Sequence, residues 1–194
     1  MRIKKLSKLP GRPRQFDPEK LLNIAQELFH SRGYDAVSIA EITTTLGINP
    51  PSFYSIFDSK IGLYTRVLER YSDIDAIPLA DILIEERPIR ECLIEILEEA
   101  ARRYASNATC KGCLVLEGLR SKDADARNIA STFYVRAEET IFQFIAKSHP
   151  QNARRLTDFI GSIMLGLSAK ARQNCSVDQL LEVAHLAGAA LIFE

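Results

Sequence analysis

The sequence lacks the features of a membrane protein or of a uniformly basic nucleic-acid binder. Its 194 residues include 25 Lys and Arg and 25 Asp and Glu, so the net charge is zero, which argues against a uniformly basic protein. No uncharged segment reaches about 18 residues, and no signal-peptide pattern follows the basic N-terminus, so the usual signs of membrane insertion or export are missing. We therefore expect a cytoplasmic protein, a compartment that also keeps cysteines reduced.

The motifs of common enzymes are also missing. The sequence contains no P-loop, no dinucleotide-binding fingerprint and no H-E-x-x-H pattern. Residues 166–170, GLSAK, resemble a G-x-S-x-G nucleophile elbow, but they lack the last Gly and lie within a helical pattern. We therefore expect no enzyme activity, no catalytic residue and no cofactor.

The four cysteines do not have the spacing of a zinc site. Cys110 and Cys113 form one C-x-x-C, but Cys92 and Cys175 are distant and no second C-x-x-C occurs, so we expect no metal. Buried packing is the favoured interpretation of the pair. A thiol-based redox sensor is an alternative, because a Cys at a helix N-terminus beside Lys111 would have a lowered pKa.

Helical patterns fill most of the chain. Residues 17–32 predict an amphipathic helix with Asp17 as its cap and Pro18 at its first position. Ser59 predicts the cap of another helix, with Lys60 in a first turn whose free amide groups and dipole favour a phosphate. No segment alternates convincingly in the manner of a strand, so we predict an all-α fold.

Residues 38–60 predict two short helices joined by a tight turn. Ser38 and Glu41 have the spacing of an S-x-x-E capping box at the start of the first helix. Gly47 ends that helix, and Asn49 followed by Pro50 starts the second, so the turn is only about three residues long. A helix, a glycine and a helix also build ordinary helical hairpins, so the neighbouring residues decide between a hairpin and a DNA-reading motif.

The second of these helices is expected to bury one face and expose the other. Phe53 and Phe57 share an apolar face with Ile48. The residues left pointing largely outward are Ser52, Tyr54, Ser55 and Ile56. A helix this short does not form alone, and an exposed face of this composition suits the major groove of DNA.

Residues 16–71 resemble the N-terminal domain of the TetR family of bacterial transcriptional regulators. The resemblance is carried by the initial helix, Gly33-Tyr34, the S-x-x-E helix, Gly47-Ile48, Ser52-Phe53-Tyr54, Phe57, Ser59-Lys60 and Leu63. It implies that Tyr54 and Lys60 contact the DNA backbone and that Ser52 lies in the groove. Ile56 replaces a residue that is often polar in the family, so we expect an apolar contact there, such as one to a thymine methyl.

Four further segments resemble one branch of that family, the branch associated with biofilm-dispersal genes. These segments are GRPRQFDP at 11–18, PPSFY at 50–54, GCLVLEG at 112–118 and GLSAKAR at 166–172. The candidate DNA-binding residues are Arg12, Arg14, Ser38, Thr43, Asn49, Pro51, Ser52, Tyr54, Ser55, Ile56 and Lys60. They predict a regulator that binds double-stranded DNA.

Charge is distributed unevenly along the chain. Residues 1–72 contain 11 Lys and Arg against 7 Asp and Glu, and six of these basic residues fall within the first fourteen positions without an acid. Such a run is not expected to fold on its own. Residues 11–14, GRPR, have the form of a minor-groove arm; a solvated tail that only attracts phosphate is the alternative.

These observations divide the chain into a basic flexible arm (1–15), a three-helix helix-turn-helix domain (16–72) and a larger helical domain for regulation and dimerisation (73–194). The connection between the domains is placed at residues 73–79. Helical segments are predicted near 88–105, 110–120, 124–147, 153–174 and 177–192. Ser176 and Gln179 form a further capping box before the last segment.

The last two helical segments carry small residues at helical spacing. The predicted dimer interface consists of Gly161, Leu165, Ser168, Ala184, Gly188 and Leu191. Such faces also pack inside a monomer, but the resemblance implies a four-helix bundle between two subunits, and a palindromic operator requires a two-fold protein.

The resemblance also implies a small-molecule pocket among the middle helices. The candidate ligand-binding residues are Arg103, Tyr104, Cys113, Phe133 and Tyr134, although aromatic residues in such positions often form the core. We expect a homodimeric repressor that an unidentified effector releases from its operator by shifting a population. An architectural or activating DNA-binding protein without a metabolite ligand is the alternative.

Overall fold

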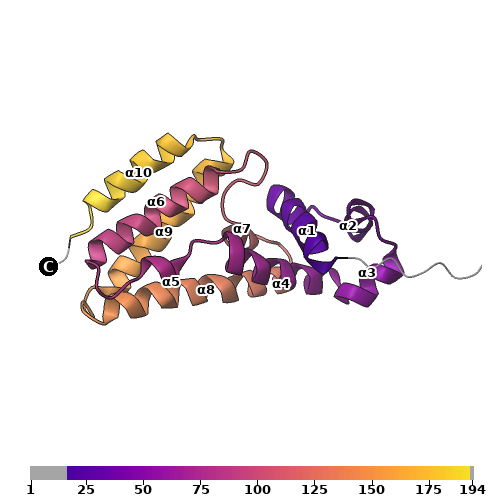
Figure 1. Cartoon of the computed structure of the whole chain (residues 1–194), viewed down its shortest axis with the longest axis horizontal. Helices are drawn as coiled ribbons and strands as arrows, with labels where there is room; N and C mark the ends of the chain where they lie inside the picture. The colour runs from indigo at the N-terminus through magenta and orange to yellow at the C-terminus, as the bar shows by residue number, and fades with distance from the viewer. Residues whose placement is uncertain (1–16, 193–194) are drawn as a thin grey trace, which may run out of the picture.

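The computed structural model describes residues 17–192, and within them the chain is all-α, as predicted (Figure 1). The elements are α1 (Pro18–Arg32), α2 (Ile39–Leu46), α3 (Pro50–Phe57), α4 (Lys60–Arg70), the π-helix η1 (Tyr71–Asp75), α5 (Leu79–Ile82), α6 (Ile89–Ala105), α7 (Leu114–Gly118), α8 (Ala124–Ala146), α9 (Ala153–Arg172) and α10 (Val177–Ala189). The predicted arm at 1–15, with Arg12 and Arg14, lies outside the described residues. No described helix has the length and apolar character that crossing a bilayer requires.

Side-chain caps fix most of the predicted helix starts. Asp17 accepts a hydrogen bond from the backbone N–H of Glu19 at the start of α1, and Ser59 accepts one from Gly62 at the start of α4. The capping box before α10 is confirmed in both directions, because Gln179 and Ser176 each accept from the other's backbone N–H. Local sequence therefore determines where these helices begin.

The S-x-x-E box before α2 forms only in part, which corrects the prediction. The Ser38 hydroxyl accepts a hydrogen bond of 3.2 Å from the backbone N–H of Glu41. The Glu41 carboxylate instead forms an ion pair with Arg32 at the end of α1. A charged partner from the preceding helix replaces the backbone N–H that the box would supply.

Aromatic residues build the core of the N-terminal helices. Phe29 of α1, Phe53 of α3 and Tyr64 of α4 are buried. The Phe29 and Tyr64 rings meet edge to face with centroids 5.2 Å apart, and the ring of Tyr34 lies 4.9 Å from that of Tyr64. Such pairs stabilise a small core beyond the area that they bury.

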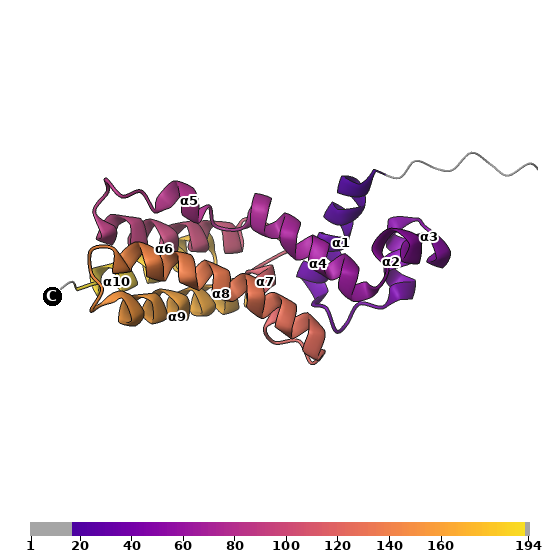
Figure 2. The same cartoon turned by 90° about the horizontal axis from the view of Figure 1, so that it is seen from below.

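The C-terminal helices form a bundle in which α6 packs against α9 and α10, and α8 runs beside α9 (Figures 1 and 2). Helix α4 extends from the N-terminal helices to α8. Helices α2 and α3 lie at the end of the molecule away from α10 in both views. The bundle is therefore connected to the helix-turn-helix mainly through α1, α4 and the elements that they touch.

Two local differences separate the structure from the predicted segments. The predicted connection at 73–79 contains the end of η1 and the start of α5, and the predicted helix at 110–120 shortens to α7. The Asn107 side chain accepts hydrogen bonds from the backbone N–H groups of Thr109 and Cys110. This turn, followed by Gly112 at φ +79°, keeps the chain non-helical until Cys113.

Polar contacts join the N-terminal and C-terminal helices at several places, two of which involve Asp35 and Arg172. The Asp35 carboxylate, after α1, accepts hydrogen bonds from the Ser121 hydroxyl (2.7 Å) and the Lys122 backbone N–H (2.8 Å) before α8. At the other place, Arg172 of α9 donates to the carbonyls of His30 and Lys111, at 3.2 Å each. These contacts hold α1 against the loops that precede α7 and α8.

Candidate nucleic-acid interface and internal cavity

The turn between α2 and α3 has the predicted geometry. Gly47 ends α2 with φ +65° and ψ +30°, the left-handed conformation that glycine adopts without strain. Asn49 then caps α3, its side chain accepting a hydrogen bond of 2.8 Å from the backbone N–H of Ser52. Pro50 occupies the first helical position. The Gly47 backbone conformation, the Asn49 cap and Pro50 therefore fix the short turn between the two helices.

Helix α3 presents one apolar face inward and another face to solvent. Phe53 and Phe57 are buried, with ring centroids 5.7 Å apart. Tyr54 is 49% exposed, its ring edge to face with that of Phe53, and Pro51 and Ser55 are also exposed. An aromatic hydroxyl and a small polar side chain therefore stand on the outer face of α3.

Lys60 is held at the junction of α3 and α4. Its Nζ donates a hydrogen bond of 2.7 Å to the Tyr34 carbonyl and lies 3.8 Å from the centroid of the Tyr34 ring. Burial lowers the pKa of Lys60 and raises that of Tyr34 to about 12. Tyr34 was absent from the predicted site, although Gly33-Tyr34 was part of the pattern that suggested the family.

The remaining predicted DNA-binding residues differ in exposure. Ser38 and Asn49 are exposed caps, while Ser52 is half-buried. Ile56 is half-buried against the core, so it points outward less than predicted. The prediction that Thr43 contacts DNA is corrected, because the residue is buried. Its hydroxyl donates a hydrogen bond of 3.0 Å to the Ala40 carbonyl of its own helix. The amphipathic pattern of α2 places Thr43 beside the buried Ile42.

A cavity of about 520 Å³ lies inside the C-terminal helices. Residues 71–73 and 76–81, which we call the connecting segment, form one side of it, and α8 and α9 form much of the rest. Four of the predicted ligand-binding residues line it, namely Tyr104, Cys113, Phe133 and Tyr134. Gly161, which was assigned to the dimer interface, lines it as well.

Arg103 does not line this cavity, so the prediction that it belongs to the ligand-binding set is corrected. It lines a separate space of about 240 Å³ between α1 and the loop after α6. There its guanidinium pairs with Glu99 at 2.9 Å and donates 3.3 Å to the Asp75 carbonyl. The next residue, Tyr104, points about 100° around the axis of α6 from Arg103 and lines the larger cavity instead.

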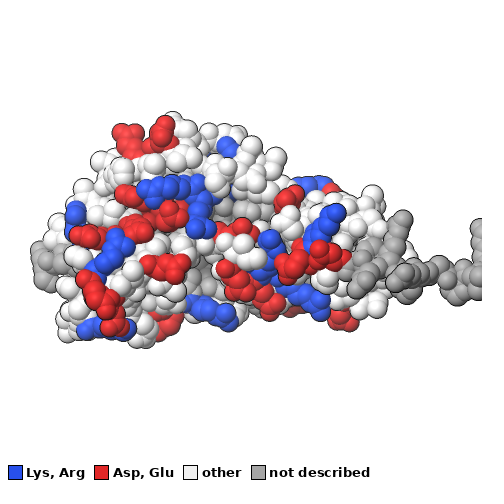
Figure 3. Space-filling view, in the orientation of Figure 1, with Lys and Arg blue, Asp and Glu red and all other residues white. Residues whose placement is uncertain are grey.

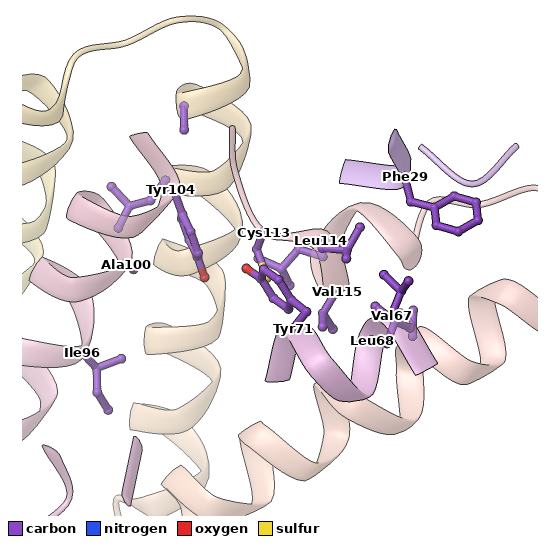
Figure 4. Close-up of a cluster of buried hydrophobic side chains, with 14 of the residues drawn as sticks. Phe29, Val67, Leu68, Tyr71, Ile96, Ala100, Tyr104, Cys113, Leu114 and Val115 are labelled. Atoms are coloured by element: carbon purple, nitrogen blue, oxygen red, sulfur yellow. The ribbon is translucent and has the colours of Figure 1, made fainter. Parts of the chain in front are cut away.

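Two tyrosines converge on Cys113 at the end of the cavity (Figure 4). Tyr71 comes from η1 and Tyr104 from α6, and their hydroxyl ends point toward the space beside the thiol. Both rings are buried, and burial raises the pKa of each tyrosine well above its ordinary value. This end of the cavity is therefore neutral and rich in hydrogen-bonding groups.

Comparison with known proteins decides the family. Residues 21–67 match the family described as "Bacterial regulatory proteins, tetR family". The chain is 55% identical to the HTH-type transcriptional repressor BdcR of Escherichia coli (strain K12) over 191 residues, covering 98% of this chain and 97% of BdcR. The chain belongs to the TetR family. It is a helix-turn-helix transcriptional repressor and not an enzyme.

Two other proteins extend the comparison of this TetR-family chain. It is 30% identical to the HTH-type transcriptional repressor ComR of Escherichia coli (strain K12), covering 92% of this chain and 90% of ComR. It is 28% identical to a solved cysteine mutant of the TetR-family regulator CifR, complexed with 26-bp double-strand operator DNA. That structure aligns with a TM-score of 0.81 and covers 93% of this chain and 100% of that one.

The TetR-family chain contains free cysteines at all four positions. Cys110 is buried, with its Sγ 3.7 Å from the Glu27 carbonyl of α1. Burial raises the pKa of this thiol, so the predicted lowering is wrong for Cys110. Within residues 17–192, no three His, Cys, Asp or Glu side chains are grouped so that they could hold a metal ion.

Most residues of the predicted dimer interface are buried inside this protomer. Gly161, Ser168, Ala184, Gly188 and Leu191 are all buried. A Cβ at Gly188 would lie 2.8 Å from Cγ1 of Ile94, so this glycine permits close packing of α10 on α6. The structure therefore corrects the predicted face: of the six residues, Leu165 alone is exposed, at 43%.

Two features of the cavity escaped the sequence interpretation. The connecting segment was predicted as a linker, yet it covers the cavity. Glu138 also lines the cavity and accepts a hydrogen bond of 2.9 Å from the Tyr134 hydroxyl. The spacing of Tyr134 and Glu138, one helical turn apart, was the available signal, since residues four apart lie on one face of a helix.

Proposed function

We propose that this TetR-family repressor binds a palindromic operator as a homodimer through residues 38–60, and that a small molecule in the cavity releases it. The observation that carries the proposal is α3, with Phe53 and Phe57 buried and Tyr54 exposed at the far end of the molecule. The CifR complex with operator DNA supports the assignment, since it is similar over most of the chain.

DNA contacts are assigned to residues of the predicted set that are exposed or half-buried on α3 and at the start of α4. Tyr54 and Lys60 contact phosphates, and Pro51, Ser52 and Ser55 face the groove. Thr43 is left out because it is buried. Charge of both signs is interspersed over the face shown in Figure 3, so that face carries no broad basic surface.

The dimer face is assigned to the exposed apolar side chains of α9 and α10. Leu165 is 43% exposed, Val183 42% and Leu186 68%. Gly166 and Ala169 lie beside Leu165 on the exposed side of α9. A large exposed apolar surface on neighbouring helices marks an interaction site, and two copies packed through it would form the four-helix bundle that the family resemblance implies.

The branch associated with biofilm-dispersal genes is part of the proposal. It is supported by the four segments at 11–18, 50–54, 112–118 and 166–172 and by 55% identity to BdcR. The genes beside the recovered operator test it directly. An operator upstream of unrelated genes would contradict the branch and leave the repressor function intact.

The decisive experiment is genome-fragment selection with purified protein at near-physiological salt, followed by titration of the recovered fragments. We expect a short inverted repeat bound at least about a thousandfold more tightly than random duplex. Tyr54→Ala should weaken that binding by roughly tenfold with unchanged thermal stability, because the side chain is exposed. Uniform weak binding to all fragments would contradict the proposal.

Sedimentation analysis tests the dimer face separately. Leu186→Glu should convert the dimer to monomer and weaken operator binding, because it places a charge in an apolar contact. Val135→Glu is the matched control, since Val135 of α8 is 54% exposed and lies outside the proposed face. A dimer that persists in Leu186→Glu would show that the copies associate through another surface.

A further inference from the structure

The charges around the cavity of about 520 Å³ are mainly negative. Asp73 and Asp81 of the connecting segment and Glu138 of α8 line it, whereas Arg136 is the one basic residue among its lining side chains. Three carboxylates against one guanidinium disfavour an anionic ligand, and the effect is stronger in a partly enclosed space than on an open surface.

Glu138 is the best placed of these carboxylates to contact a ligand. It is half-buried, and its Oε1 accepts the Tyr134 hydroxyl at 2.9 Å. Within residues 17–192, Glu138 forms no ion pair with a Lys or Arg side chain. A half-buried carboxylate with one neutral hydrogen-bond donor retains capacity for a positively charged partner.

Gly161 of α9 lies close to this pair. A Cβ at Gly161 would lie 3.1 Å from the Tyr134 hydroxyl and 3.5 Å from Oε1 of Glu138, so the glycine allows α9 to approach the pair closely. The Tyr134 and Glu138 side chains are therefore held against α9 at the wall of the cavity.

The rest of the cavity suits an apolar body. Its walls include Leu116, Phe133, Ile141 and Met164. Arg136 lies at the exposed rim with its guanidinium carbon 5.7 Å from the centroid of the Phe133 ring. Aromatic faces attract cations as well as apolar groups, so the walls and the carboxylate favour the same kind of molecule.

We propose that the effector is a small apolar cation, such as an alkyl or arylalkyl amine, whose protonated nitrogen binds Glu138 and whose body fills the cavity. The proposal rests on the proposed function, because it names the chemical class of the molecule that releases the operator. The amine N–H donates to the Glu138 carboxylate, and Tyr134 holds that carboxylate in place.

Three probes of one shape test the charge requirement. They are 4-phenylbutylamine, 4-phenylbutanol and 4-phenylbutyrate, titrated calorimetrically into the full chain and into its operator complex. The amine should bind about tenfold more tightly than the alcohol and release the operator, and the carboxylate should bind more weakly than both. Equal binding of amine and alcohol, tighter binding of the carboxylate, or no binding by any probe would overturn the proposal.

Substitutions identify the carboxylate that binds the amine. Glu138→Gln should lower amine affinity by about tenfold and leave alcohol affinity unchanged. Glu139→Gln is the matched control, because Glu139 is the exposed neighbour on α8 and accepts a hydrogen bond from the Gln143 side chain. Asp81→Asn, on the exposed side of the connecting segment, should lower amine affinity by roughly twofold. It replaces Glu138→Gln as the test if that variant fails to fold. Amine affinity unchanged in both cavity variants would overturn the proposal.

Operator binding without a probe separates the two ideas. If operator titration shows specific binding but the amine has no preference, the cationic class fails and the repressor function stands. If the chain binds no operator specifically, the proposed function fails independently of the calorimetry.

Discussion

Tyr71 lies edge to face against His30, with ring centroids 5.7 Å apart and an interplanar angle of 89°. Tyr71 lines both the large cavity and the smaller space beside α1, and His30 belongs to α1 itself. A ligand that displaced the Tyr71 ring would therefore press directly on a helix of the DNA-binding part. This contact is one direct connection between the cavity and α1.

Replacing Tyr71 tests its role as the wall between the two spaces. Tyr71→Ala should lower the free energy of unfolding by about 3–5 kcal/mol, because a large buried ring leaves a void. Tyr71→Phe should lower it by only about 1 kcal/mol, since the ring stays. Urea unfolding measures both, and Tyr54→Ala, at an exposed tyrosine, is the control that should stay within about 0.5 kcal/mol. A small loss in Tyr71→Ala would contradict the packing.

The stability of the protein should fall in mild acid because of His30. Its Nε2 lies 3.1 Å from the Gly112 carbonyl. Burial lowers the pKa of His30 from 6.5 and the charge of Arg172 lowers it further, which outweighs the hydrogen bond to Gly112 and the charges of Asp75 and Glu117 that raise it. The unfolded chain therefore binds this proton more readily. The contribution of a neutral His30 is complete above about pH 6.5 and is lost progressively as the pH falls below that value.

Urea unfolding at about pH 7.5 and 5.5 measures this effect. Wild type should lose more stability than His30→Gln between the two values, with a slope from His30 of at most about 1.4 kcal/mol per pH unit. The glutamine amide can still donate to the Gly112 carbonyl, so the variant should fold. Equal losses in the two proteins would show that His30 does not titrate in this range.

Asp35 should stabilise the start of α8 from outside that helix. Its carboxylate accepts hydrogen bonds from Ser121 and from the backbone N–H of Lys122, and that backbone bond is the main reason for its lowered pKa. Asp35→Asn should cost about 1 kcal/mol, as loss of a helix cap does, and should speed amide exchange near residue 122. The control is Asp125→Asn, an exposed acid in the first turn of α8. Equal exchange in the two variants would contradict the assignment.

Gly118, at the end of α7, should tolerate no larger side chain without a loss of stability. A Cβ there would collide with the Tyr64 hydroxyl and lie 2.6 Å from Cβ of Ala130. Gly118→Ala should therefore lower the free energy of unfolding by about 1–3 kcal/mol, measured by urea unfolding. A gain in stability, as expected for Gly→Ala in an unconstrained helix, would show that α7 shifts at little cost.

The helix starts and the turn before α3 could be predicted because they depend on a few adjacent residues. Asn49 and Ser176 cap helices through their own side chains, and Gly47 supplies the turn conformation. The buried face of α3 follows from the period of Phe53 and Phe57. These signals are local and need no knowledge of distant contacts.

Other features depend on which elements meet in space. The small residues around Gly188 predicted a surface for a second subunit, but α6 occupies that surface through Ile94. A stripe of small residues predicts close packing without identifying the partner. In the same way, Glu138 in a polar helix becomes a cavity residue only because the connecting segment folds over it. Lys60 likewise contacts Tyr34, 26 residues earlier.

Helix α8 runs without interruption from Ala124 to Ala146. Asp35 contacts the chain just before its first turn, and Glu138 lies about 22 Å farther along its axis at 1.5 Å per residue. A helix resists bending over such a length, so we expect a displacement at one end of α8 to move the other end. A tilt of a few degrees about its contacts with α9 would displace the loop at Asp35 by about 1 Å over that length, and the Asp35 hydrogen bonds would transmit the shift to the end of α1.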